Sequence, residues 1–312
     1  FGISLVFGAV GSFDNRAIGE YIAMNSDKLP GFFYGGVVLI LVGMLFKISA
    51  APFHFWAPDV YQGSPTVFTA FMSTVVKTAA IVAIMRLFLS IVFGGIGEFW
   101  IPILGVCVGL TFVIGNLSAA VQTSVKRMLA FSSISHAGFL LLAVVAATGF
   151  SAKAIIFYTV GYSIASLVAF TVLLNVIRIA GGDNIDIFNG LAKKNPLLAV
   201  VMCIALLSLA GIPPTAGFFA KYYVLTAAIG TGHYWLAIIG ILSSLVGVYY
   251  YFRIIIAMYF RESNDEHTYT VDAQHQALLF VTAVATIVLG LLPDLILNIG
   301  APVAAVAESL PQ

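Results

Sequence analysis

The sequence has 312 residues, of which 61% are hydrophobic and only 9% are charged, against roughly 25% charged residues in an ordinary soluble domain. This composition excludes a soluble globular protein and indicates a polytopic membrane protein, with a single membrane domain over residues 1–312 in a lipid bilayer. The net charge of +1 is spread thinly along the chain and gives no basis for binding nucleic acid.

Apolar stretches long enough to cross a bilayer follow one another along the chain. Residues 1–10 look like the end of a span and lack an initiator Met, so we expect an N-terminally truncated piece of a longer protein. A polar connector precedes the complete spans. These are predicted at residues 33–51, 65–93, 100–121, 126–147, 153–178, 196–230, 234–260 and 274–297. Lipid requires each backbone polar group to be satisfied internally, so the fold class should be an all-α polytopic membrane protein.

The stretch 196–230 is too long for one straight helix across the membrane. It would extend about 52 Å, whereas the hydrocarbon core of a bilayer is about 30 Å thick. Gly211, Pro213 and Pro214 lie in its middle, and two successive prolines remove two backbone donors. We therefore predict a broken helix with two halves here.

Three lysines lie inside the apolar stretches: Lys47, Lys77 and Lys221. Counting helical rise from an end of each span places them about 21, 18 and 14 Å deep, near the middle of the bilayer. A charge there costs about 2.5 to 3.5 kcal/mol on insertion scales and therefore indicates a function. Unlike arginine, a buried lysine can gain and lose a proton as nearby charges change. We predict a proton relay along a midplane row of lysines; a snorkelling or structural role is the alternative.

Two histidines are further candidates for this relay. His136 lies about 15 Å into its predicted helix, with Ser132 one turn earlier on the same face. It is placed to carry protons between Lys77 and Lys221, and a core histidine with satisfied hydrogen bonds is the alternative. His54 follows the proline that ends the preceding span. A role as a gate and a role in capping or loop packing explain it equally well.

The sequence carries no recognisable cofactor motif. It lacks a phosphate-binding loop, a dinucleotide fingerprint, and the ligand patterns of haem, iron–sulfur or metal sites. Cys107 and Cys203 lie within apolar stretches, with no disulfide or metal spacing. We expect no cofactor and no redox chemistry in this chain.

Three blocks of residues, in this order, resemble a known family. They are PFHFWAPDVYQGSPT at 52–66, between Lys47 and Lys77, then KRMLAFSSISHAG at 126–138, and AGIPPTAGF at 210–218, shortly before Lys221. Together they resemble the N-type antiporter-like subunits of respiratory complex I. The letters DVYQG within the first block favour the N type over its L-type and M-type relatives.

The resemblance implies an antiporter-like helix bundle with inverted repeats, each containing a broken helix. Lys47 and Lys221 would be the lysines of the two broken helices, Lys77 the connecting lysine, and His136 part of a polar helix in the second repeat. It further implies a proton-translocating subunit of NADH:quinone oxidoreductase, next to M-type and K-type subunits. NAD, FMN, iron–sulfur clusters and quinone would be bound in partner subunits. The expected location is the plasma (inner) membrane of a bacterium rather than an organelle inner membrane.

Two other functions would use the same residues. A cation/proton antiporter subunit of the related multisubunit type is the first, and sodium-dependent transport without NADH or quinone would favour it. A spacer that only holds neighbouring subunits is the second. Loss of assembly on neutralising a lysine, without a selective defect in pumping, would favour the spacer.

Overall fold

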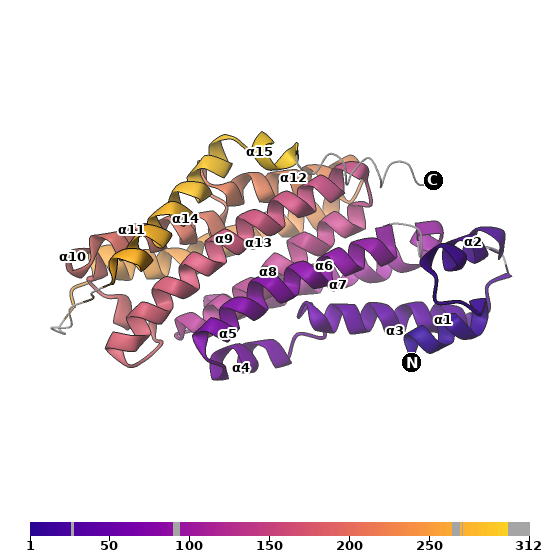
Figure 1. Cartoon of the computed structure of the whole chain (residues 1–312), viewed down its shortest axis with the longest axis horizontal. Helices are drawn as coiled ribbons and strands as arrows, with labels where there is room; N and C mark the ends of the chain where they lie inside the picture. The colour runs from indigo at the N-terminus through magenta and orange to yellow at the C-terminus, as the bar shows by residue number, and fades with distance from the viewer. Residues whose placement is uncertain (26–27, 90–93, 264–268, 270, 299–312) are drawn as a thin grey trace.

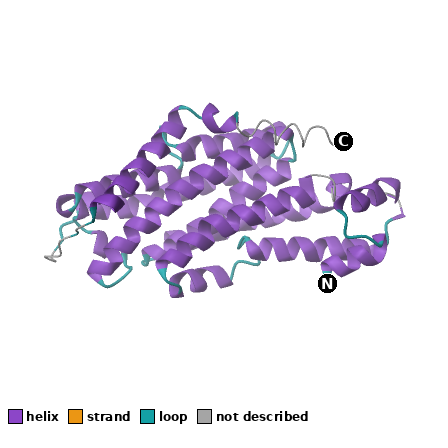
Figure 2. Cartoon of the chain, viewed as in Figure 1, coloured by secondary structure: helices purple, strands orange, loops and turns teal. Residues whose placement is uncertain are grey.

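The computed structural model describes residues 1–25, 28–89, 94–263, 269 and 271–298. Within these residues the chain is helical and has no strand (Figure 2), so the predicted all-α fold class is confirmed. Among them, six helical stretches are long and apolar enough to cross a membrane. They are Thr66–Phe88, Gly97–Ala120, Val125–Ala146, Gly149–Ala180, Tyr234–Phe260 and Ala273–Leu291. Gly31–Lys47 and Pro196–Ala210 are shorter apolar helices.

The first helices form one edge of the bundle (Figure 1). α1 (Gly2–Val10) packs along α3 (Gly31–Lys47). Glycines allow the close approach, since a Cβ on Gly2 would lie 2.8 Å from the carbonyl oxygen of Gly36. The polar connector between these helices is not all loop, because α2 (Asn15–Asn25) forms there and buries two isoleucines. These isoleucines are one helical turn apart, which is the pattern that favours a helix.

The first complete span is a shorter helix than the sequence predicts. α3 ends at Lys47, close to Ser49, whose left-handed backbone (φ 61°) cannot continue a right-handed helix. A turn then leads to α4 (Trp56–Gly63). Within the turn the Ala51 N–H donates to the hydroxyl of Thr111 at 2.9 Å. This bond ties the turn to the core of the bundle.

The next span is a helix whose winding changes locally. α5 (Thr66–Phe71) continues into a π-helical turn, Met72–Val76, and then into α6 (Lys77–Ile84). A second π-helical turn, Met85–Leu89, follows. Such turns insert an extra residue into a helix and are frequent at functional sites. The predicted end of this span, 90–93, lies outside the described residues.

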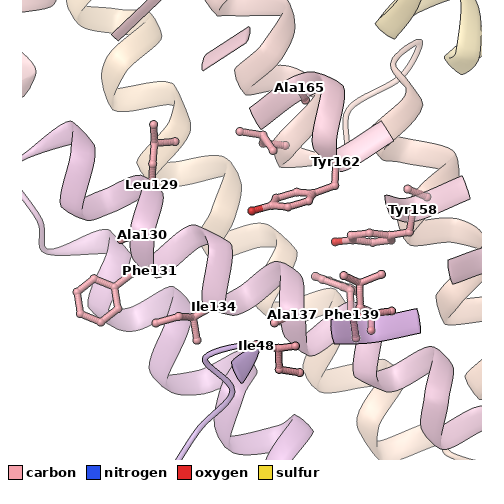
Figure 3. Close-up of a cluster of buried hydrophobic side chains, with 14 of the residues drawn as sticks. Ile48, Leu129, Ala130, Phe131, Ile134, Ala137, Phe139, Tyr158, Tyr162 and Ala165 are labelled. Atoms are coloured by element: carbon pink, nitrogen blue, oxygen red, sulfur yellow. The ribbon is translucent and has the colours of Figure 1, made fainter. Parts of the chain in front are cut away.

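α7 (Gly97–Ala120), α8 (Val125–Ala146) and α9 (Gly149–Ala180) form the core. The whole apolar stretch of α8 is buried by the helices around it, which is the environment that a helix with apolar residues on every side requires. Figure 3 shows side chains of α8 and α9 that fill this core. α7 approaches α8 closely at Gly115, where a Cβ would lie 2.9 Å from the backbone nitrogen of Ser135.

The stretch 196–230, predicted to be a broken helix, is two helices in the structure. α11 (Pro196–Ala210) and α12 (Ala216–Gly230) are separated by a turn that begins at Gly211. The φ of Gly211 is 86°, a left-handed conformation that glycine adopts without steric cost. The side-chain amide of Asn195 caps the start of α11 by accepting from the backbone of its third residue.

The last helices close the bundle around α9 and α11. The remaining α-helices are α10 (Leu191–Lys194), α13 (Tyr234–Phe260), α14 (Ala273–Leu291) and α15 (Asp294–Leu297), and Gly94–Ile96 and Ile185–Phe188 are short 3-10 helices. The predicted span 274–297 is two helices rather than one, because Pro293 lies between α14 and α15. α14 packs on the turn between α11 and α12 through Gly290, where a Cβ would lie 2.0 Å from the carbonyl oxygen of Pro214.

Candidate functional site

Lys77 begins α6 and its side chain is 2% exposed. Its Nζ donates to both the backbone carbonyl and the hydroxyl of Ser133 on α8. In the π-helical turn just before it, the hydroxyls of Ser73 and Thr74 both donate to the carbonyl oxygen of Ala70, at 3.0 and 2.7 Å. The extra residue of this turn rotates the helix that follows, and so sets the direction in which Lys77 points.

Lys221 lies on α12, just after the break, and is 8% exposed. Its Nζ donates to the carbonyl oxygen of Ala210 at 2.8 Å and lies 5.2 Å from the ring centre of Phe139 on α8. The last carbonyls of a helix have no donor of their own, and a cation at this end is favourable. A Cβ on Gly211 would lie only 2.8 Å from the Lys221 Cδ. The break therefore supplies both the acceptor and the space for this lysine.

His136 lies on α8 between the contacts of the two lysines. It is three residues after Ser133 and three before Phe139, so these contacts are about 9 Å apart along the helix axis. Its Nδ1 is 2.7 Å from the hydroxyl of Tyr158, and its Nε2 is 3.2 Å from the hydroxyl of Tyr251. Three of the five predicted site residues thus meet at one helix, because Lys77 from α6 and Lys221 from α12 contact α8 on either side of His136.

A cavity of about 10 Å³ lies beside His136 and Tyr158. This is roughly the volume that one water molecule needs. The other residues that line it belong to α9, α11 and α12, and they are Gly161, Tyr162, Ala165, Ser208, Leu209, Gly217 and Ala220. Ala220 immediately precedes Lys221 in the chain. The cavity therefore lies where α9 faces the two halves of the broken helix.

Lys47 does not belong to this group in the structure. It is the last residue of α3 and its side chain is exposed. The buried side of α3 carries Leu41 and Leu45, and Ile48 just after the helix continues the same face. Lys47 is two residues after Leu45, about 200° around the helix, and so points the other way. The prediction of a buried lysine is wrong for Lys47, whereas Lys77 and Lys221 are buried. A role of Lys47 in the relay stays a prediction.

His54 lies in the turn between α3 and α4 and is buried. Its Nδ1 has no hydrogen-bond partner among the described residues, and its ring centre is 4.7 Å from that of Phe55. No hydrogen bond joins it to the lysines or to His136 in the part of the chain that the structure describes. Its role as a gate stays a prediction.

The sequence prediction misses Ser133, Tyr158 and Tyr251. Tyr158 and Tyr162 lie one turn apart on α9 and both point toward α8 (Figure 3). Two tyrosines at this spacing inside an apolar helix are a signal that identifies them, because buried hydroxyls require partners. Tyr251 belongs to a run of three tyrosines, a pattern that favours packing as much as function.

Within the described residues, no three His, Cys, Asp or Glu side chains come together as a metal site requires. Both cysteines are free thiols, with Cys107 buried and Cys203 half-buried. The expectation that NAD, FMN, iron–sulfur clusters and quinone are bound by other subunits stays a prediction.

Similar sequences agree on one family. A family model described as NADH:quinone oxidoreductase/Mrp antiporter, TM, matches residues 1–247. NADH-quinone oxidoreductase subunit N of Chloroflexus aggregans is 43% identical over 99% of this chain and 62% of that protein. Subunit N of Cytophaga hutchinsonii is 44% identical over 96% of this chain and 64% of that protein. The resemblance to N-type subunits is confirmed, and the chain spans less than two thirds of the length of these relatives.

Solved structures share the fold. A chain of respiratory complex I from Thermus thermophilus with bound aureothin has a TM-score of 0.79 at 35% identity, over 95% of this chain and 64% of that chain. A chain of an archaeal membrane-bound sulfane sulfur reductase has a TM-score of 0.87 at 28% identity, over 98% and 62%. A chain of the Mrp complex from a Dietzia species reaches 0.85 at 23% identity, over 97% and 64%, and supports the fold alone. The antiporter-like fold is thereby confirmed, and the chain belongs to the NADH:quinone oxidoreductase/Mrp antiporter transmembrane family.

Proposed function

We propose that this chain belongs to a proton-translocating membrane subunit of an NADH:quinone oxidoreductase, and that Lys77, His136 and Lys221 form its proton relay. The observation that carries the proposal is the placement of two buried lysines on either side of one buried histidine along α8. The similarity to relatives named subunit N supports the assignment to such a complex.

The charges of the two lysines are the physical basis of the relay. No carboxylate pairs with Lys77 or Lys221 among the residues that the structure describes. The residues of α8 that the two ammonium groups contact are about 9 Å apart along the helix axis. Two unit charges at a separation of that order repel one another by about 2 kcal/mol at an effective dielectric constant of about 20. A proton on one lysine therefore disfavours a proton on the other. A charge change at one end of the pair would drive a proton through His136 toward the other end.

The remaining parts of the assignment concern the rest of the complex. NADH oxidation and quinone reduction would take place in partner subunits, which bind NAD, FMN, iron–sulfur clusters and quinone. M-type and K-type subunits are the proposed neighbours in the membrane, and the plasma (inner) membrane of a bacterium is the proposed location. Lys47 and His54 would act toward the end of the relay that lies beyond Lys77.

A cation/proton antiporter subunit is the second candidate function. The family model covers Mrp antiporters, and a chain of the Mrp complex shares the fold. The same lysines and histidine would then exchange protons against a cation. Proton movement that requires sodium and persists without NADH or quinone favours this alternative.

The test compares lysine variants of the full-length protein in its complex. Lys77→Ala and Lys221→Ala should leave assembly intact and lower NADH-driven proton uptake by membrane vesicles about tenfold or more, because each removes a protonatable group that the relay needs. Lys193→Ala, at an exposed position before α11, is the matched control and should behave as the unaltered protein. Quinone reduction and native gel electrophoresis separate a pumping defect from lost assembly. Normal proton uptake in both buried-lysine variants contradicts the proposal.

A further inference from the structure

A second, larger cavity of about 310 Å³ lies at one end of the bundle. Its volume is at the lower end of the range for ligand pockets, about 300 to 1,000 Å³. Its walls come from the turn between α7 and α8, the segment between α9 and α10, and the end of α13. The lining residues are Thr123, Asn184, Ile185, Asp186, Arg253 and Arg261. Two arginines against one aspartate give the cavity a net positive charge, which suits an anion.

Backbone hydrogen bonds join the two loop segments of this cavity. The Val125 N–H donates to the carbonyl oxygen of Asp183 at 2.7 Å, and the Ile185 N–H donates to that of Thr123 at 2.9 Å. The walls are therefore held by the backbone itself. A site with walls that are already in place requires less ordering when a ligand binds.

The guanidinium of Arg253 is held in place and keeps one edge for a ligand. Its Nη1 donates to the carbonyl oxygens of Ala120 and Gln122, at 2.7 and 3.0 Å, where α7 ends. These two bonds use both hydrogens of Nη1. The edge formed by Nε and Nη2 has no hydrogen-bond partner in the part of the chain that the structure describes. Two parallel N–H groups of this kind bind a phosphate through two of its oxygens.

Arg261 supplies a second positive group at the rim of the cavity. It comes directly after α13, eight residues beyond Arg253 and thus about 12 Å further along the helix axis. Its Nη1 lies 3.2 Å from Oδ1 of Asp186, and both side chains of this ion pair are at least half exposed. Exposed ion pairs are weak. Asp186 therefore orients Arg261, while an anion can still compete with the carboxylate for it.

The outward side of α13 favours a lipid over a free phosphate ion. Tyr249, Phe252 and Ile256 are 60%, 36% and 43% exposed, and their spacing of three and four residues places them in one stripe. Arg253 follows Phe252 in the chain and is half-buried, so it lies at the border of this stripe. A long basic side chain at such a border keeps its stem along the apolar surface and its charge at the level of the headgroups.

The charge of this end of the bundle also favours an anionic lipid. Helices α8 and α11 begin there, and α9 and α13 end there. Further basic residues lie in or next to its loops, and they are Lys126, Arg127, Arg178, Lys193 and Lys194. Loops rich in lysine and arginine face the cytoplasm, and the cytoplasmic leaflet carries anionic lipids.

We propose that this cavity binds the phosphate of an anionic bilayer phospholipid through Arg253 and Arg261, with an acyl chain along Tyr249, Phe252 and Ile256. A zwitterionic lipid brings a cationic group that the two arginines repel. A free phosphate ion gains nothing from the apolar stripe. The proposal goes beyond the proton relay and does not rest on it, because no residue of the relay lines this cavity.

Photocrosslinking tests the lipid directly. We would reconstitute the complex containing the full-length protein into nanodiscs with phosphatidylglycerol that carries a diazirine in its acyl chain, and count adducts on α13 by mass spectrometry. Adducts should exceed those from the matching phosphatidylcholine probe about fivefold or more, and Arg253→Gln or Arg261→Gln should each lower them about fivefold. Arg178→Gln is the matched control, because Arg178 is exposed near the end of α9 and does not line the cavity.

Each outcome supports or overturns the proposal. Equal adducts from the two probes, or unchanged adducts in both arginine variants, overturn it. Adducts that are missing from the stripe of α13 in the unaltered complex overturn it too, because protein then covers that face. Inorganic phosphate is added against chloride at equal ionic strength, and a drop to the phosphatidylcholine level would assign the cavity to free phosphate instead. If Arg253→Gln fails to assemble on a native gel, Arg261→Gln decides, since it leaves the bonds to the end of α7 intact.

Discussion

Replacing Gly211 with alanine tests how the helix break holds Lys221. Two costs follow from the structure. An alanine at a φ of 86° costs about 1 to 2 kcal/mol. The new Cβ would also lie 2.8 Å from the Lys221 Cδ and displace Nζ from the carbonyl oxygen of Ala210. A hydrogen bond to a charged group is worth about 1.5 to 3 kcal/mol, so the total loss is about 2.5 to 5 kcal/mol.

Gly232→Ala separates these two costs. Gly232 has nearly the same backbone, with a φ of 81°, and nothing lies within 4 Å of a Cβ built on it. In both variants the strained backbone should lower the free energy of unfolding by about 1 to 2 kcal/mol. Only Gly211→Ala should lose the additional stability of about 1.5 to 3 kcal/mol and the NADH-driven proton uptake. Thermal unfolding of the purified full-length protein, together with proton uptake by vesicles, measures both. Equal unfolding temperatures and equal uptake for the two variants would refute the reasoning.

Two further substitutions probe how the site is supported. Gly290→Ala should prevent assembly or abolish proton uptake, because its Cβ would lie 2.0 Å from the Pro214 carbonyl oxygen. Gly182→Ala is the control, because nothing lies within 4 Å of a Cβ built there, and this variant should assemble normally on a native gel. Asp59→Asn should lower stability by less than about 1 kcal/mol, because its 2.7 Å ion pair with Arg127 is largely exposed, and the loss should shrink further at high salt in thermal unfolding. Normal assembly together with normal proton uptake in Gly290→Ala, or loss of assembly in Gly182→Ala, would contradict the first expectation. A loss of stability well above about 1 kcal/mol in Asp59→Asn would contradict the second.

The sequence predicts those parts of the site that depend on a single segment. A charge within an apolar stretch is costly in lipid, and this cost points to Lys77 and Lys221, although it points to Lys47 as well. The break at Gly211 follows from excess length and from two prolines, since no straight helix fits. Both predictions need only the chain itself and the thickness of a bilayer.

Features that depend on packing between segments are harder to predict. Depth along a helix does not say which side faces the core, and Lys47 has the depth of a buried residue but lies on the exposed side of α3. The partners of His136 come from α9 and α13, far apart in the sequence, so periodicity within one helix cannot pair them. The small helix α2 buries only two isoleucines, one turn apart, in an otherwise polar segment. This pattern is too short to distinguish a helix from a loop in the sequence.

The central claim is that Lys77 and Lys221 gain and lose protons, and arginine tests it most directly. Arginine keeps the positive charge and the ability to donate to the Ser133 and Ala210 carbonyl oxygens, but it does not release its proton in proteins. The measurement is the number of protons taken up per NADH oxidised by vesicles containing Lys77→Arg or Lys221→Arg in an assembled complex. We predict that both variants assemble and that the ratio falls in each. A normal ratio in both would show that the lysines contribute charge alone and would contradict the relay.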